Sequence, residues 1–151
     1  MLNLELVPST SWGANLRSRL RPSQWDQVRR WTYREADYLC EICGGVGTKH
    51  PVEAHETWSY DDVNHVQTLV GMVALCPTCH MGKHIGRTLT VGSQQTQDRV
   101  LAHIMQVNHW TVARLILELD IAFAQHAERS EHEWTLDISW IERVIGSSPS
   151  Q

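Results

Sequence analysis

The sequence predicts an α+β protein centred on a strand–turn–strand–helix finger. A four-cysteine zinc site holds the finger, and helices and a short terminal sheet flank it. Three observations predict this fold: all four cysteines occur in two CxxC pairs, apolar β-branched segments lie between the pairs, and helix-period segments follow them. The length of 151 residues suits one compact domain. We expect that domain over residues 1–146, with the finger core at about 36–88 and a flexible tail at 147–151.

The chain begins with an alternating segment and continues into a helix-period segment. Leu2, Leu4 and Leu6 alternate with polar residues, which predicts a short strand. Residues 23–38 are expected to form a helix that Ser23 caps and that leads into the first cysteine pair. The candidate core contacts of this helix are Trp25, Val28, Trp31 and Tyr38.

The cysteines form the most specific motif in the chain. They are Cys40 and Cys43, then Cys76 and Cys79, with 32 residues between the pairs. Two CxxC turns can direct four thiolates tetrahedrally at one zinc ion. Disulfides fit poorly because nothing indicates export, a redox CxxC lacks its strand–helix context, and free buried thiols would not explain the matched spacing. We therefore predict a closed zinc site that stabilises the fold and performs no chemistry.

The interval between the two pairs is longer than the ~15–20 residues of a simple zinc ribbon, which indicates an inserted hairpin. Residues 51–58 are predicted to be extended, and residues 66–75 form a candidate strand rich in β-branched and apolar side chains. Polar residues at 59–64 suit the turn between them. A short helix is then expected from Pro77, which suits a first helical position, to Gly86, which could end it.

A helical extension over about 93–128 and a strand over about 133–141 are predicted after the finger. Ser93 and Thr111 are placed to cap two helices, over 94–107 and 112–128. Apolar and polar residues alternate in the strand, which could pair with the N-terminal strand. The residues expected to face inward are Val100, Leu101, Ile104 and Met105 in the first helix and Val112, Leu115, Ile116, Leu119 and Phe123 in the second.

Three histidines lie at positions that suit a second metal site. His80 and His84 are four residues apart in the short helix, so both imidazoles would lie on one helix face. His55, in the first strand, could provide a third ligand from across the fold. Three protein ligands with open coordination positions are typical of a catalytic metal. The remaining histidines are expected to be ordinary surface or core residues: His50, His65, His103, His109, His126 and His132.

Charge and hydropathy limit the classes of partner. The net charge is −4, from 13 basic and 17 acidic residues, which argues against general affinity for nucleic acid. Six arginines nevertheless lie within residues 14–34, where they form either a basic face or a solvated helix surface. No apolar run approaches the ~20 residues of a membrane helix, and the first residues lack a signal-peptide pattern. We therefore expect a cytoplasmic protein with no membrane partner.

Taken together, the motifs CEIC, VEAHE and ALCPTCHMGKH resemble those of the HNH nucleases of the ββα-metal, or His-Me finger, superfamily. The resemblance covers about residues 36–88. It implies that the cysteine pairs are structural zinc knuckles, that His80 and His84 bind a catalytic divalent ion, and that the substrate is a DNA phosphodiester. In such enzymes the ion stabilises charge on the departing oxygen, and a side chain of the first strand deprotonates the attacking water.

The sequence departs from the family pattern at two places. The first strand normally carries a ligand followed by a base. Either His55 is the ligand and Glu56 the base, or His55 is the base and Ala54, which cannot bind metal, holds the ligand position. Glu53 lies two residues before His55 on the same strand face and is a candidate extra ligand. Gly71 occupies the position of the supporting asparagine.

Several nearby side chains are candidates for contact with nucleic acid. Lys49, Lys83 and Arg87 could each meet a phosphate or be an ordinary solvated charge. Other residues around the turn could line a groove in which rings stack on bases, but we prefer a packed aromatic beside a polar turn. These residues are Trp58, Tyr60, Asp61 and Asp62.

The function predicted from these motifs is a metal-dependent endonuclease with a structural Zn²⁺ and a second divalent ion. That ion would be Mg²⁺, Mn²⁺, Ni²⁺ or Zn²⁺, and histidine ligands favour the transition ions over magnesium. Glu56 or, as the second choice, His55 would activate water. The alternative is a catalytically degenerate zinc module that binds DNA or a protein partner. The missing asparagine and the acidic net charge argue for this alternative. A purely structural domain of a larger assembly is the third hypothesis.

Overall fold

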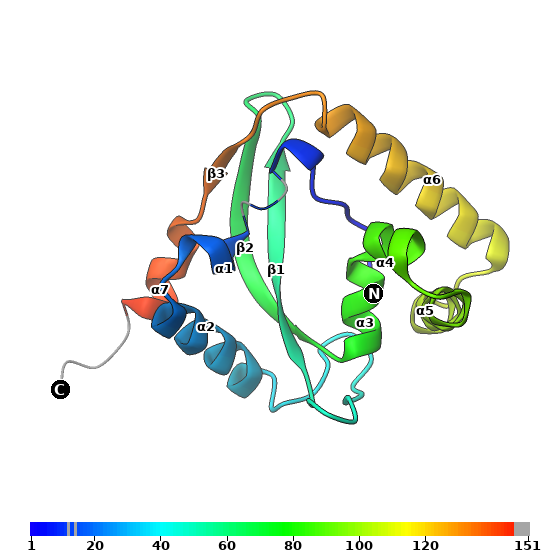
Figure 1. The fold of residues 1–151 in the computed structure, drawn as a ribbon, viewed down its shortest axis with the longest axis horizontal. Helices are drawn as coiled ribbons and strands as arrows, with labels where there is room; N and C mark the ends of the chain where they lie inside the picture. Colours follow the sequence, from blue (N-terminus) through cyan, green and yellow to red (C-terminus); the bar gives the residue numbers. More distant parts are fainter. Residues whose placement is uncertain (12, 14, 147–151) are drawn as a thin grey trace.

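The computed structural model describes residues 1–11, 13 and 15–146, so the predicted tail lies outside the described residues. One three-stranded sheet lies among the helices, which confirms the α+β class (Figure 1). The elements are η1 (Ser9–Ser11), α1 (Leu16–Arg19), α2 (Pro22–Glu35), β1 (Glu53–Asp61), β2 (Val66–Leu75), α3 (Pro77–Lys83), α4 (Ile85–Val91), α5 (Gln94–Asn108), α6 (Val112–Arg129), β3 (Thr135–Asp137), η2 (Ser139–Ile141) and α7 (Glu142–Ile145).

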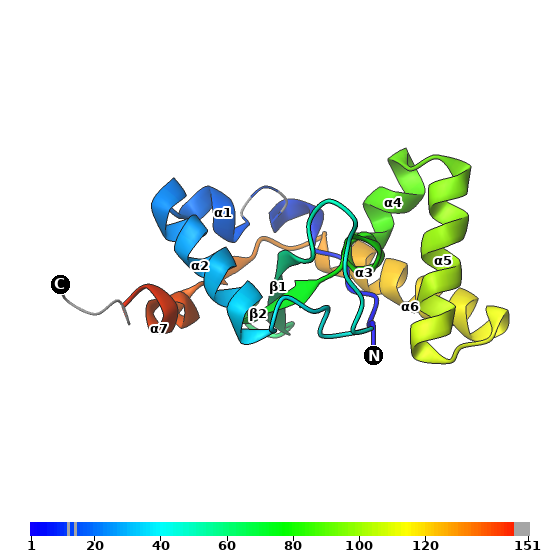
Figure 2. The same cartoon turned by 90° about the horizontal axis from the view of Figure 1, so that it is seen from below.

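The helices divide into two groups around the strands. Helices α1, α2 and α7 gather on one side, and α3 to α6 gather on the other (Figures 1 and 2). Each group has its own buried cluster, and a third cluster surrounds the cysteines. The strands therefore lie between two helical cores, and the thiol-centred core lies at one end of the hairpin, where β2 leads into α3. No helix in the described part of the chain is long and apolar enough to cross a membrane.

Strands β1 and β2 form the predicted hairpin. They pair antiparallel, and the register shifts after Thr57, which pairs with Gly71, because Trp58 pairs with Leu69. Val70 is thus the extra residue of a β-bulge, a feature that bends a strand and increases its twist. Strand β1 continues to Asp61, beyond the predicted end of the extended segment. The observed order of strand, turn, strand and helix is the predicted one.

The predicted terminal sheet is wrong. Strand β3 pairs parallel with β2 and is only three residues long, whereas the first eight residues form no strand. The reason lies in Asn108, whose side-chain amide accepts from the Leu2 N–H at 2.7 Å and donates to the Leu2 carbonyl at 2.8 Å. This amide takes the place of a neighbouring strand. The alternating leucines pack against the cluster of helices α4 and α5, where Leu2 is fully buried and Leu4 and Leu6 are half-buried.

The finger helix is shorter than predicted. Helix α3 ends at Lys83, and Gly86 lies inside α4 and does not end a helix. A Cβ atom at Gly86 would lie 2.9 Å from Leu6 Cδ2, so the glycine permits close packing of the N-terminal segment. Gly82 has the same role, because a Cβ there would lie 2.8 Å from Leu2 Cδ2.

The predicted caps of the two long helices are confirmed, but the cap of α2 is not. Ser93 and Thr111 accept backbone N–H groups at the start of α5 and α6. In α2 the N-cap is Arg21 and Pro22 occupies the first turn, so Ser23 lies inside the helix. Tyr38 lies beyond α2 and is exposed, unlike its predicted core position.

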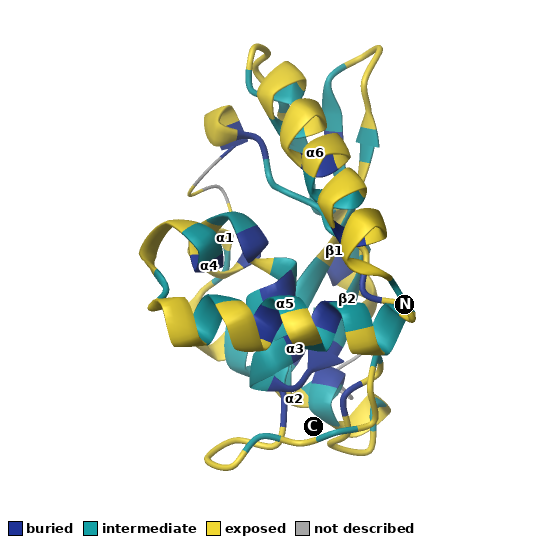
Figure 3. Ribbon diagram, turned by 90° about the vertical axis from the view of Figure 1, so that its right-hand side faces the viewer, coloured by how far each residue is buried: buried dark blue, intermediate teal, exposed yellow. Residues whose placement is uncertain are grey.

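Helix α6 buries a narrower face than its periodicity predicts. Leu115 is buried and Leu119 packs against the same cluster, but Val112, Ile116 and Phe123 are exposed. Figure 3 shows α6 at the edge of the molecule with most of its surface exposed. The helix packs on one side only, so its other apolar residues have no covering layer. In α5 the predicted inward residues are confirmed, because Val100, Leu101, Ile104 and Met105 all belong to the cluster.

Candidate metal centres

The four cysteines converge at the end of the hairpin. Cys40 and Cys43 lie in the loop after α2, and Cys76 and Cys79 lie at the start of α3. Their Sγ atoms all lie within 4.8 Å of one another. Backbone N–H groups of Gly45 and Cys79 point at the sulfurs of Cys43 and Cys76, at 3.4 and 3.5 Å. The predicted convergence is confirmed, and the cluster could hold a metal ion.

The protonation of these thiols depends on their neighbours. A hydrogen bond from Cys79 lowers the pKa of Cys40 to about 4. The same contact, followed by burial, raises the pKa of Cys79, and burial raises the pKa of Cys43. Four packed sulfurs cannot all ionise because thiolates repel one another. A divalent cation removes this conflict, so the donor set fits such an ion.

A fifth side chain contacts the thiol cluster. His103 Nε2, on α5, lies 3.0 Å from Cys79 Sγ. With its proton on Nε2, this imidazole donates to the sulfur and orients it, as groups behind a ligand commonly do. His103 is one of the histidines that we expected to be ordinary surface or core residues. No motif spacing could have identified it, because His103 lies 24 positions after Cys79 in the sequence.

The three predicted histidines form a second cluster. His55 comes from β1, His80 from α3, and His84 is the C-cap of α3. Their ring nitrogens lie within 4.8 Å of one another. The ring centroids of His55 lie 5.2 Å from His80 and 4.9 Å from His84, and Nε2 of His80 lies 3.1 Å from Nε2 of His84. The structure thus brings the rings together, and their role as ligands of a catalytic ion stays a prediction.

Glu53 contacts this cluster from behind. Its Oε2 atom forms a hydrogen bond with Nδ1 of His80. Glu53 and His55 are two residues apart in β1, so their side chains lie on the same face of the hairpin. Nε2 of His80 consequently faces His84. A carboxylate on one ring nitrogen orients the other toward a metal. This geometry suits Glu53 as an orienting partner of His80, whereas the sequence suggested an extra ligand.

His55 has the environment of a metal ligand. Within the described residues, its buried Nδ1 atom has no hydrogen-bond partner. Burial, and then the neighbouring imidazoles, lower the pKa of His55 to about 2, and burial lowers the pKa of His84 to about 4. Both rings are therefore neutral near pH 7, with lone pairs available. A cation bound by the three rings would satisfy the orphaned nitrogen.

These histidine pKa values predict a pH-dependent stability. The pKa of an unperturbed histidine is 6.5, so the unfolded chain binds more protons than the folded chain between about pH 6.5 and pH 4. The free energy of unfolding should therefore decrease as the pH falls through this window. We expect His55→Gln to make the decrease shallower when urea unfolding is compared at about pH 7 and about pH 5. His50→Gln, in an exposed loop, should keep the wild-type slope. An unchanged slope in His55→Gln would contradict a buried neutral His55.

Glu56 lies on the face of β1 opposite to His55. Its Oε1 atom accepts the backbone N–H of Leu16, the first residue of α1, at 3.0 Å. Burial raises the pKa of its carboxyl group. Glu56, His55 and His84 nevertheless line one cavity of about 700 Å³, and β1 is an edge strand of the sheet. The predicted base and two predicted ligands therefore share one space.

The predicted phosphate contacts differ in position. Lys83 and Arg87 line the cavity. The Lys83 ammonium donates to the Asn3 side chain, and burial lowers the pKa of Lys83. Lys49 is exposed in the loop between the first cysteine pair and β1, and it is not among the described residues that line the cavity. Two of the three candidates are thus close to the histidine cluster.

The aromatic and acidic residues of the turn are mostly structural. Asp62 pairs with Arg129 at 2.7 and 2.9 Å, and that guanidinium lies 4.1 Å from the centroid of the Tyr60 ring. Asp61 accepts N–H groups within the turn. This confirms the preferred interpretation for these three residues. Trp58 also packs against a hydrophobic cluster, as that interpretation predicts, and in addition it lines the cavity.

Comparison of the chain with known protein families, with curated proteins and with solved structures found no match. The interpretation of the two clusters therefore depends on their geometry and on the sequence motifs.

Proposed function

We propose that this protein is a metal-dependent endonuclease of the HNH type that hydrolyses DNA phosphodiester bonds. We further propose that its four cysteines bind a structural zinc ion. The observation that carries the proposal is the cluster of three imidazoles, whose ring nitrogens lie within 4.8 Å of one another. Two of these rings, His55 and His84, line a cavity that the half-buried carboxylate of Glu56 also lines. Three imidazoles and a carboxylate that borders the same cavity are the kinds of group that metal-assisted hydrolysis requires.

His55, His80 and His84 would hold the catalytic ion, with Glu53 orienting His80. When bound, a divalent ion supplies charge stabilisation at the phosphate and the leaving oxygen. Imidazole ligands favour Mn²⁺, Ni²⁺ or Zn²⁺ over Mg²⁺. The His55 nitrogen without a hydrogen-bond partner supports this assignment, since a ligand role accounts for a buried polar atom that would otherwise cost stability.

Glu56 is the proposed general base. Burial raises the pKa of its carboxyl group toward neutral pH, where a base is most effective. The Leu16 N–H holds one carboxylate oxygen in place. Lys83 and Arg87 add positive charge to the same cavity, which suits a phosphate group. Beside this wall, α1 and α2 carry exposed arginines that could contact the DNA backbone: Arg17, Arg19, Arg30 and Arg34.

We expect Glu56→Gln to reduce DNA cleavage by roughly 10²–10⁴-fold while metal binding is retained, because an amide cannot accept the proton of the attacking water. A plasmid-nicking assay combined with metal titration measures both effects. Glu133→Gln, at an exposed position before β3, is the matched control and should cleave at the wild-type rate. Full activity of Glu56→Gln would remove Glu56 as the base.

A second function is favoured by Gly71 and by the net charge of −4. Gly71 lies beside the bulge, and an added Cβ there would meet nothing within 4 Å, so the described structure has no side chain in the supporting position. The alternative is a zinc-stabilised module that binds DNA or a protein partner without cleavage. It predicts one bound zinc per chain and no nicking with Mg²⁺, Mn²⁺, Ni²⁺ or Zn²⁺. Nicking that a chelator abolishes would reject it.

A further inference from the structure

The cavity beside the histidines extends to a second group of residues that the proposed hydrolysis does not use. Gln67, on β2, is 2% exposed, and Ser11, at the end of η1, is 8% exposed. Both residues line the cavity. Within the ranges that the structure describes, Gln67 Oε1 and Ser11 Oγ have no hydrogen-bond partner. Two of the residues that line the cavity thus each hold a buried polar atom without a partner.

Unpaired polar atoms at such buried positions are unfavourable for folding. A buried polar atom without a partner loses its hydration and gains nothing in return. An apolar side chain would suit the position of Gln67 better, because Leu69, two residues along the strand, belongs to a hydrophobic cluster. Unpaired buried polar groups that reduce stability are expected at functional sites, where a bound ligand supplies the missing hydrogen bond.

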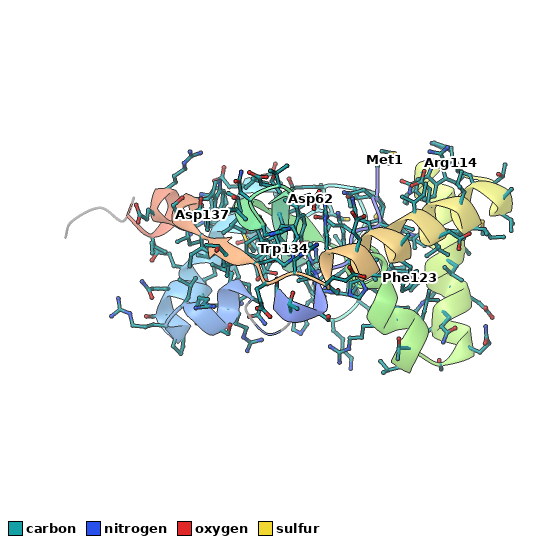
Figure 4. The ribbon with its side chains drawn as sticks, turned by 90° about the horizontal axis from the view of Figure 1, so that it is seen from above. Met1, Asp62, Arg114, Phe123, Trp134 and Asp137 are labelled. Atoms are coloured by element: carbon teal, nitrogen blue, oxygen red, sulfur yellow. The ribbon has the colours of Figure 1, made fainter. Side chains whose placement is uncertain are left out.

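Aromatic rings flank the same space. Trp58 lines the cavity from β1, and Phe123 lines it from α6. Phe123 is 39% exposed and projects from α6 on the side of α4 (Figure 4). Leu6, Val7 and Val91 make other parts of the wall apolar. A cavity of about 700 Å³ lies within the ~300–1,000 Å³ range of small-molecule sites, in which apolar walls and a few polar groups fix the ligand.

We propose that Ser11, Trp58, Gln67 and Phe123 form a base pocket, which binds one unstacked nucleobase next to the phosphate cut at the histidine site. This inference rests on the proposed endonuclease function. Planar rings suit stacking on a base. The free acceptor of Gln67 requires a donor, such as the exocyclic amino group of adenine, where thymine presents a carbonyl oxygen. The substrate is thus single-stranded or locally melted DNA with an amino-bearing base beside the cut.

Direct binding tests the pocket without any need for cleavage. The full-length ¹⁵N-labelled chain is titrated with dAMP and with dTMP, and the signals of the Gln67 side-chain amide and the Trp58 indole are followed by NMR. We expect dAMP to shift both signals and to bind about tenfold more tightly than dTMP. Gln67→Leu should abolish this preference. Gln106→Leu, at an exposed position of α5, should keep it. Equal binding of the two nucleotides, or no shift with either, overturns the pocket.

The stability of Gln67→Leu separates a ligand role from a structural one. Because the leucine removes an unpaired buried oxygen, we expect its urea midpoint to rise above the wild-type value while base preference is lost. A lower midpoint with unchanged dAMP binding assigns Gln67 a structural role and overturns the pocket.

Cleavage of random-sequence single strands separates the two proposals. If the chain cuts with equal frequency beside all four bases, and Gln67→Leu leaves the pattern unchanged, the base pocket is overturned while the endonuclease stands. The other outcome is that the chain cuts no DNA, yet dAMP still shifts the Gln67 signal. The endonuclease proposal then fails, and a nucleobase site remains.

Discussion

Replacing Cys76 with alanine is expected to leave the purified chain without zinc and largely unfolded at room temperature. Cys40, Cys76 and Cys79 are buried in one cluster with Val52 and Leu75, so the thiols are also part of a core. A structural zinc ion contributes about 10–16 kcal/mol of apparent binding free energy to folding. The whole stability of a domain is only about 5–15 kcal/mol. Elemental analysis gives the zinc content, and circular dichroism gives the helix content.

The matched control for Cys76→Ala is Val46→Ala. Val46 is 58% exposed in the loop after the first cysteine pair, and its truncation should leave zinc content and unfolding temperature unchanged. A chelator should reproduce the effect of Cys76→Ala in the wild-type protein. Our assignment of a structural metal would be wrong if Cys76→Ala stayed helical and unfolded cooperatively at the wild-type temperature.

Replacing His80 with alanine is expected to reduce plasmid nicking by on the order of 10³-fold or more, because the proposed catalytic ion would lose one of its three proposed ligands. The loss should also remove the partner of Glu53. The thiol cluster is untouched, so the variant should keep one zinc per chain and its helix content. Nicking rates at several concentrations of Mn²⁺ or Ni²⁺, with elemental analysis of the same samples, measure both expectations.

His50→Ala is the control for His80→Ala, since His50 is exposed in the loop before β1. It should nick DNA at the wild-type rate. Wild-type nicking by His80→Ala at every ion concentration would show that the histidine cluster is not the catalytic centre, although the thiol cluster could still be a zinc site.

The two large effects concern neighbouring residues of one helix. Cys79 and His80 are adjacent in α3, yet we expect replacement of a cluster cysteine to affect folding and replacement of His80 to affect cleavage. Successive side chains of an α-helix point about 100° apart, so one turn can face both clusters. Helix α3 therefore links the proposed structural ion to the proposed catalytic one.

Features that depend on short spacing could be predicted from the amino-acid sequence alone. A CxxC turn places two sulfurs together, and two histidines four residues apart meet on one side of a helix, whatever the rest of the chain does. The hairpin and the caps Ser93 and Thr111 are equally local, because strand alternation and N-cap hydrogen bonds involve near neighbours. These features were predicted and are present in the structure.

Features that join distant segments became visible only in the folded chain. The Asn108 amide replaces a strand beside Leu2, His103 reaches Cys79 from α5, and residues from the N-terminus, β2 and α6 meet in one cavity. None of these contacts follows from spacing, because each depends on how complete elements pack. The same reason explains the exposed face of α6, since periodicity shows that a helix has an apolar side but not whether a neighbour covers all of it.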